Sequence, residues 1–199
     1  MSAYALYSNN YYDDAIFNLE RHLKNYPKDK NLVYAHYLIA ICYFEQLYDE
    51  KKDLKPLVKA REKFNYVLNY YPNTDYAIDA KWKMGLIVDQ MAAKEMYIGR
   101  YYMKIEKWIA AINRFQFVVK HYDTTVYIEE ALHRLVEIYY TIGLVEEAQK
   151  IASVLGYNYG SGEWYKNSYR VFNKSYNIEK NIKKKKDSFI RKKFKKLLE

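Results

Sequence analysis

The chain has 199 residues, half of them apolar, so it is long enough to bury a sizeable core in one domain or two small ones. Its single cysteine excludes an intramolecular disulfide, and six Gly and three Pro favour long helices joined by short turns. The net charge is +9, but residues 180–199 carry ten Lys or Arg against two acidic residues, so the nearly neutral remainder argues against a broad basic surface for nucleic acid.

The N-terminal stretch up to Tyr26 ends in the second helix of a helical hairpin. Ala15 lies eleven residues before Tyr26, a spacing that recurs later in the chain and marks a second helix. The first helix of this hairpin must therefore lie before Tyr11, where only about ten residues are available and no capping residue precedes them. We expect the full repeat to begin further upstream, with an N-terminal truncation.

Three places in the chain share one ten-residue phrase. The stretches "YPKDKNLVYA" (26–35), "YPNTDYAIDA" (71–80) and "YDTTVYIEEA" (122–131) each hold a Tyr, a turn-forming segment and an Ala nine residues after the Tyr. Pro27 and Pro72 end a helix because proline cannot continue the hydrogen-bond ladder, and the Lys-Asp or Asn-Thr-Asp that follows supplies a turn and the next N-cap. The phrase therefore predicts three joints between helices.

The residues around these joints have the spacing of the second tetratricopeptide helix. In four places an Ala lies eleven residues before a Tyr and four residues before a second apolar residue. A small Ala lets two helices approach closely, and the residue four positions later fills the gap on the same face. The four pairs are Ala15 and Leu19, Ala60 and Phe64, Ala111 and Phe115, and Ala148 and Ala152.

Two stretches lengthen the repeats beyond the standard length of about 34 residues. Residues 48–57 read as a charged insertion between the helices of one hairpin, and residues 79–103 read as one unusually long first helix. No apolar run approaches the roughly 18 residues of a membrane span, so we expect a soluble chain without an export signal of its own.

These patterns predict an all-α fold: a tetratricopeptide-like helical-hairpin solenoid of about four repeats over residues 1–168, with a concave inner face. Residues 169–199 form a basic C-terminal extension. Its apolar residues lie at helical spacing between cations, which fits a basic amphipathic helix on an anionic surface; a solvated, partly helical extension is the alternative. The candidate contacts to such a surface are Lys184, Lys185, Arg191, Lys192 and Lys193.

The sequence holds no constellation of residues suited to a reaction. Its four His lie in separate helical stretches without a partner at metal-binding spacing, and the Gly-rich stretch 156–164 lacks the Lys-Ser/Thr of a phosphate loop. Cys42 reads as a small buried core residue. We expect no enzymatic activity, no metal and no cofactor, and instead a protein that binds other proteins.

The repeat register places several side chains on the inner face of the first helices, where repeat proteins bind partners. Aromatic residues there suit an extended or strand-like peptide, and packing against the next repeat is the alternative. Arg114 differs, because it is a charge beside an apolar helical stripe and suits an ion pair with a partner; a solvated flank is its alternative. The inward residues are Tyr34, Tyr37, Ile41, Phe44 and Glu45 in one helix, and Glu130, His133, Glu137, Tyr140 and Thr141 in another.

Residues 71–102 and 108–165 resemble the BamD (ComL) family of outer-membrane assembly lipoproteins, and the resemblance extends over residues 1–165. The most specific shared element is an Asp-x2-Ala-x2-Glu helix followed by Tyr-Tyr. The matching elements are Tyr-Pro-x-Thr/Ser-x-Tyr with Asp-Ala, Asp89-x2-Ala92-x2-Glu95, Tyr101-Tyr102, Ala111-x2-Asn113-Arg114, Tyr122-x-Thr/Ser and Glu130-Ala131-Leu132.

The resemblance implies a non-enzymatic protein at the periplasmic face of the outer membrane, tethered there by an N-terminal lipidated Cys. With the barrel protein BamA and other assembly subunits, such a protein receives unfolded outer-membrane proteins. From the resemblance we expect the family's lipidated Cys, signal peptide and first repeat to be missing from this chain, in line with the truncation expected from Ala15, and the basic tail to extend beyond the family core.

The resemblance also divides the candidate residues between two partners. The C-terminal repeats of the family dock on BamA, and Arg114 matches the family's Asn-Arg site, so Arg114 is the first candidate. The other BamA-facing candidates are Glu130, His133, Glu137 and Tyr140, and the substrate-facing candidates are Tyr34, Tyr37, Ile41 and Phe44.

Two other functions stay open on the sequence alone. One is a generic envelope helical-repeat adaptor lipoprotein that serves the Tol or peptidoglycan machinery. The other, more distant, is an RNA-binding protein that uses the basic tail, although no nucleic acid is expected from the body of the chain.

Overall fold

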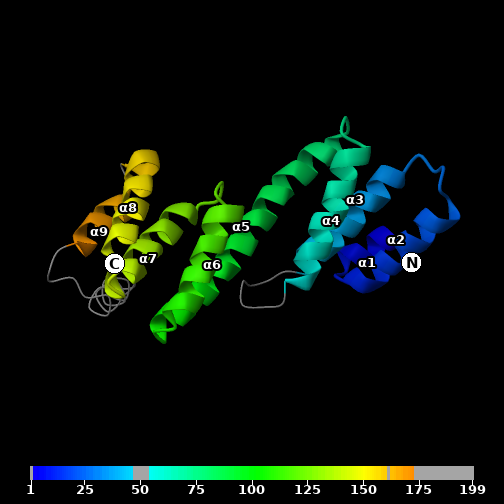
Figure 1. The fold of residues 1–199 in the computed structure, drawn as a ribbon. Coiled ribbons are helices and arrows are strands. Elements are labelled where there is room, and N and C mark those ends of the chain that lie inside the picture. The colour runs from blue at the N-terminus through cyan, green and yellow to red at the C-terminus, as the bar shows by residue number, and fades with distance from the viewer. Residues whose placement is uncertain (1, 47–53, 161, 173–199) are drawn as a thin grey trace, which may run out of the picture. The chain divides into compact units, whose positions relative to one another are not determined.

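The computed structural model describes residues 2–46, 54–160 and 162–172, and these ranges hold helices and turns but no strand (Figure 1). The predicted all-α fold of tetratricopeptide-like hairpins is thereby confirmed. The helices within the described ranges are α1 (Ala3–Ser8), α2 (Tyr12–Asn25), α3 (Leu32–Glu45), α4 (Lys55–Tyr70), α5 (Asp75–Lys104), α6 (Trp108–His121), α7 (Ile128–Thr141), α8 (Val145–Tyr159) and α9 (Glu163–Val171).

The chain divides into two compact units, Met1–Tyr97 and Ile98–Glu199. In the first unit, α1 packs on α2, α2 on α3 and α3 on α4. In the second unit, α6 packs on α7, α7 on α8, and α9 on both α7 and α8 (Figure 1). Within each unit, these helices pack on their neighbours in sequence, as helical hairpins do. The boundary expected at residues 168 and 169 falls inside α9.

The small residues of the repeat pattern lie at the centre of each hairpin. Ala15, Ala60, Ala111 and Ala148 are all fully buried. The residues four positions later are buried as well, and two of them, Phe64 and Phe115, rank among the largest fully buried side chains. Burial of a Phe side chain contributes roughly 2–3 kcal/mol, so these rings are principal contributors to the stability of their hairpins.

The three joints between hairpins share their hydrogen bonds. Tyr26, Tyr71 and Tyr122 each follow the last residue of a helix and donate their backbone N–H to the carbonyl four residues earlier. In two joints, the hydroxyl of Thr74 or Thr125 then donates to the Tyr carbonyl, at 2.8 Å and 2.7 Å respectively. The repeated phrase therefore ends each helix in the same way, and its second and third copies also share the Thr hydrogen bond.

The joints differ in how they cap the next helix. The Thr74 hydroxyl accepts the Ala77 N–H at 3.3 Å, so the N-cap that the sequence predicts at α5 is present. The corresponding prediction, that Asp29 supplies the N-cap of α3, is wrong. Asp29 accepts the N–H of Asn31 at 2.7 Å, and α3 begins at Leu32 without a side-chain cap, because the Asp29 carboxylate closes the turn instead.

The turns inside three of the hairpins use a left-handed residue. Asn10, Glu106 and Gly143 have φ values of 63°, 59° and 85°. Each lies five residues before the buried Ala of its hairpin. In each turn the next residue donates its N–H to the carbonyl five residues back, and the left-handed residue donates to the carbonyl three residues back. This is the Schellman arrangement of a helix end, which joins two helices with few residues.

The long first helix expected at residues 79–103 is confirmed as α5, which spans 30 residues. It begins four residues earlier than expected, because Thr74 caps it. Near its end, Gly99 lies against the ring of Phe115 on α6, and a Cβ added at Gly99 would come within 2.7 Å of that ring. A glycine is therefore required there for the two helices to approach.

The charged insertion expected at residues 48–57 lies largely outside the described residues, and α4 begins at Lys55 with Pro56 in its first turn. Among the helices that the structure describes, none is both long enough and apolar enough to cross a membrane.

Candidate functional site

The first unit contains a cluster of tyrosines from α3 and α5. The ring of Tyr76 lies 5.8 Å from that of Tyr34 and 5.1 Å from that of Tyr37, measured between centroids. The Tyr37 hydroxyl donates to the Asp79 carboxylate at 2.5 Å. Burial, that hydrogen bond and the carboxylate charge together raise the pKa of Tyr37 well above its ordinary value. Both predicted residues, Tyr34 and Tyr37, are half-buried in this cluster.

The other two candidates on α3 are placed differently. Ile41 is buried, so it belongs to the core of the hairpin and presents no surface to a partner. Phe44 is half-buried, packs edge-on against Phe64 at 6.3 Å, and has the Lys83 ammonium 5.2 Å from its ring centroid. Phe44 therefore presents an aromatic edge and a cation side by side.

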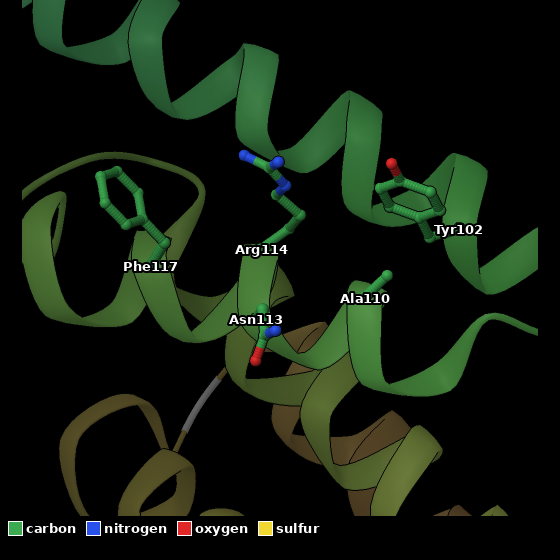
Figure 2. A pocket seen from close by; sticks show the side chains of 5 residues that line it. All are labelled: Tyr102, Ala110, Asn113, Arg114 and Phe117. Atoms are coloured by element: carbon green, nitrogen blue, oxygen red, sulfur yellow. The ribbon is translucent and has the colours of Figure 1, made fainter.

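The second unit contains a pocket of about 280 Å³ lined by Arg114. Figure 2 shows the Arg114 side chain reaching from α6 toward the helix that carries Tyr102, while Phe117 lies one turn further along α6. Ala110 and Asn113 complete the lining. A guanidinium beside aromatic rings suits a carboxylate, because it can donate two parallel hydrogen bonds while the rings exclude water.

The predicted residue Glu130 belongs to an ion-pair network rather than standing alone. Its two carboxylate oxygens pair with Arg100 of α5 at 3.0 Å and with Arg134 at 3.1 Å. Arg134 also donates to Glu137 at 2.6 Å. Burial would lower the pKa of Arg134, but the charges of Glu137 and Glu130 outweigh it and raise that pKa. Glu137 is only 2% exposed, so it acts inside the fold.

The remaining predicted residues of α7, His133 and Tyr140, are covered by α9. Nδ1 of His133 lies 2.8 Å from the Ser168 hydroxyl, and Nε2 lies 3.4 Å from the Glu137 carboxylate. Tyr140 packs edge-on against Phe172, with ring centroids 5.6 Å apart. The inner face expected on this helix is thus largely occupied by α9 of the same chain. The predicted tail residues Lys184, Lys185, Arg191, Lys192 and Lys193 lie outside the described residues.

Sequence reasoning missed several residues that complete these sites. Arg134 could have been found, because it lies four residues after Glu130 and three before Glu137, the spacings at which helical side chains pair. Asp79, Tyr76 and Ser168 come from other helices, so only the tertiary structure brings them to their partners. Within the described ranges, no group of three or more His, Cys, Asp or Glu could hold a metal ion.

Comparison with known proteins identifies the family. A family model described as "YfiO: Outer membrane lipoprotein" matches residues 1–154. The chain belongs to this family. Curated proteins named "Outer membrane protein assembly factor BamD" match over most of the chain, as the resemblance predicts. The printed names describe these relatives as assembly factors, in line with the non-enzymatic role expected from the sequence.

Three of these relatives show how similar the chain is to members of the YfiO/BamD family and how much of each protein is covered. The protein from Caulobacter vibrioides is 46% identical over 173 residues, which is 87% of this chain and 57% of that protein. The protein from Rickettsia prowazekii is 42% identical over 171 residues, which is 86% and 68% of the two chains. The protein from Neisseria meningitidis serogroup A is 33% identical over 168 residues, which is 79% and 63%. The chain therefore spans between 57% and 68% of the length of these relatives.

Proposed function

We propose that this chain is a non-enzymatic scaffold of the outer-membrane β-barrel assembly machinery, which binds the periplasmic domains of BamA and unfolded barrel substrates. The family and the printed names of its relatives support the general role in outer membrane assembly. They also favour this role over a Tol or peptidoglycan adaptor and over an RNA-binding protein. Attachment to the periplasmic face of the outer membrane through a lipid anchor is part of the proposal.

The observation that carries the proposal is the Arg114 pocket. It combines a cation with two aromatic rings in one concave site, and Arg and Tyr are the residue types that contribute most to protein interfaces. The pocket suits a partner that inserts a carboxylate side chain with apolar neighbours. We assign this contact to BamA, because Arg114 is at the Asn-Arg position of the family.

The remaining candidates divide between the two partners. Glu130 presents part of its carboxylate to solvent beside Arg100 and lies at the edge of the BamA-facing surface, whereas His133 and Glu137 support that surface from within. Tyr34, Tyr37 and Phe44 form the substrate-facing surface in the first unit, with Ile41 beneath them. We also propose that the basic tail adds affinity for anionic lipid. The test compares the binding of anionic vesicles by the full chain and by a chain without residues 180–199.

The proposal is tested by co-purification of BamA's periplasmic region with the chain. Arg114→Glu should weaken binding by about 2 kcal/mol or more, roughly thirtyfold in Kd, because it places a carboxylate where the partner presents one. Lys120→Glu is the matched control, since it makes the same change of charge at an exposed position of the same helix. Equal binding of both variants would remove Arg114 from the interface.

A further inference from the structure

The turn between α5 and α6 differs in sequence from the two turns that share its geometry. Asn10, Glu106 and Gly143 are the left-handed residues of these turns, and the second helix of each hairpin begins two residues later. Two acidic residues lie in the first turn of α2 and of α8, where the helix dipole favours negative charge, whereas α6 has none there. Ile109 and Ala110 occupy the two equivalent positions of α6. This helix therefore lacks a stabilising charge that the other two have.

The residues around this turn expose apolar side chains to solvent. Ile109 is 76% exposed, so it contributes little to the core. Tyr101 and Ile105, four residues apart at the end of α5, are exposed as well, and Trp108 is half-buried. All four belong to the end of the α5–α6 hairpin, drawn in green in Figure 1. This end therefore offers two aliphatic side chains with aromatic residues beside them.

The charge at this hairpin end also differs from that of the other two turns. Residues 104–110 hold two Lys and one Glu, a net charge of +1. The equivalent residues 8–14 and 141–147 each hold two acidic residues and no Lys or Arg, a net charge of −2. Lys104 and Lys107 are exposed, and within the described part of the chain neither pairs with a carboxylate. An external anion can therefore approach both ammonium groups.

This combination of side chains matches the boundary between the headgroups and the acyl chains of a bilayer. Lys can lay its methylene stem along apolar surface while its ammonium stays among the headgroups, and Tyr and Trp concentrate at the same depth. Each Lys near an anionic leaflet adds attraction. A protein interface fits less well, because Lys is depleted there. We refer to this set as the α5–α6 tip: Tyr101, Lys104, Ile105, Lys107, Trp108 and Ile109.

We propose that the α5–α6 tip is a lipid-contact site, at which Ile105 and Ile109 enter the headgroup region of an anionic bilayer while Lys104 and Lys107 meet its phosphates. Stable attachment to a membrane takes two signals, so the tip adds to another membrane contact of the chain and does not replace it. The inference goes beyond the proposed function, since it needs neither BamA nor a barrel substrate, and it does not involve the basic tail.

The test is sedimentation of the full chain with vesicles of phosphatidylcholine and phosphatidylglycerol. Ile109→Asp should weaken binding by about fivefold or more, because it removes an apolar side chain and places a carboxylate among lipid phosphates. The variant should fold at least as stably as the unaltered chain, because it restores an acidic residue that α2 and α8 have. Val126→Asp is the matched control, since it makes the same kind of change at a 78% exposed position, and it should bind as the unaltered chain does.

A second measurement reports on the tip itself. The dye NBD, attached to Ile109→Cys in a Cys42→Ala chain, should move its emission to shorter wavelength when these vesicles are added, because it leaves water. NBD on Glu146→Cys, at the equivalent position of α8, should not shift.

Equal vesicle affinity of Ile109→Asp and Val126→Asp would overturn the proposal, and so would equal shifts, or no shift, at the two labelled positions. A shift at Ile109→Cys with BamA's periplasmic region but not with vesicles would also overturn it, because the tip would then be a protein contact.

Discussion

At the scale of single residues, Gly99 sets how closely α5 approaches α6. A Cβ there would lie 2.7–3.1 Å from the ring of Phe115, which is fully buried and cannot move aside. Gly99→Ala should therefore destabilise the chain by about 1–3 kcal/mol, the usual cost of overpacking a core. The measurement is the free energy of unfolding from urea denaturation.

Gly85 provides the matched control in the same helix. A Cβ at Gly85 meets nothing within 4 Å. Gly85→Ala should therefore stabilise the chain by about 0.5–1 kcal/mol, because Ala loses less conformational freedom in a helix than Gly. Equal changes in the free energy of unfolding for Gly99→Ala and Gly85→Ala would contradict the close approach of α5 to α6 at Gly99.

Cys42 reports on the core of the first unit. Its side chain is fully buried, as the sequence predicts, and burial raises the pKa of its thiol to about 12. At pH 8 only about one thiol in ten thousand would be ionised, and the thiolate is the reactive form. Ellman's reagent should therefore label Cys42 only as fast as the native chain opens, and at once in guanidinium. Rapid stoichiometric labelling of the native chain would contradict this burial.

The raised pKa of Cys42 also has a consequence for stability. The unfolded thiol ionises near pH 9, whereas the folded thiol stays protonated up to about pH 12, so its contribution is complete below pH 9 and is lost as the pH rises between these values. Cys42→Ala should accordingly reduce the decline of the unfolding free energy with pH in this window.

At the scale of elements, the turn between α5 and α6 carries strain that the turn between α7 and α8 avoids. Glu106 has a φ of 59°, whereas the corresponding residue between α7 and α8 is Gly143. A residue with a Cβ pays roughly 1–2 kcal/mol in the left-handed region. Glu106→Gly should therefore raise the free energy of unfolding by about 1 kcal/mol, measured by urea denaturation.

Lys107→Gly is the control for this turn. Lys107 has a φ of −82°, which any residue adopts, so glycine relieves no strain there and only adds freedom to the unfolded chain. The expected result is a small loss of stability. A gain at Lys107 equal to the gain at Glu106 would show that the left-handed turn is not the cause.

The elements that the sequence predicts are those defined by local spacing. The joints at Tyr26, Tyr71 and Tyr122 and the long helix α5 follow from proline, Ala spacing and capping residues, and the structure has them. The packing of α9 on α7 could not be predicted, because it depends on Ser168 and Trp164 meeting His133 from another helix. The same reason explains why His133, Glu137 and Tyr140, expected on an open inner face, are covered.

At the scale of the whole molecule, the proposed function assigns a different candidate surface to each of the two units. The first unit offers half-buried aromatic rings around Tyr34 and Tyr37, which suit an extended apolar segment. The second offers the Arg114 pocket, which suits a carboxylate. A scaffold that brings a substrate to a second protein needs two such surfaces, and their different chemistry makes them separable by mutation.

The most direct test measures both partners against both surfaces. Binding of BamA's periplasmic region and of an unfolded outer-membrane protein would be compared for the unaltered chain, Arg114→Glu and Tyr34→Ala, with helicity checked by circular dichroism. We predict that Arg114→Glu weakens BamA binding by roughly thirtyfold or more and leaves substrate binding within about twofold, and that Tyr34→Ala weakens substrate binding and leaves BamA binding within about twofold. Loss of both partners in both variants, or of neither partner in either variant, would contradict the account.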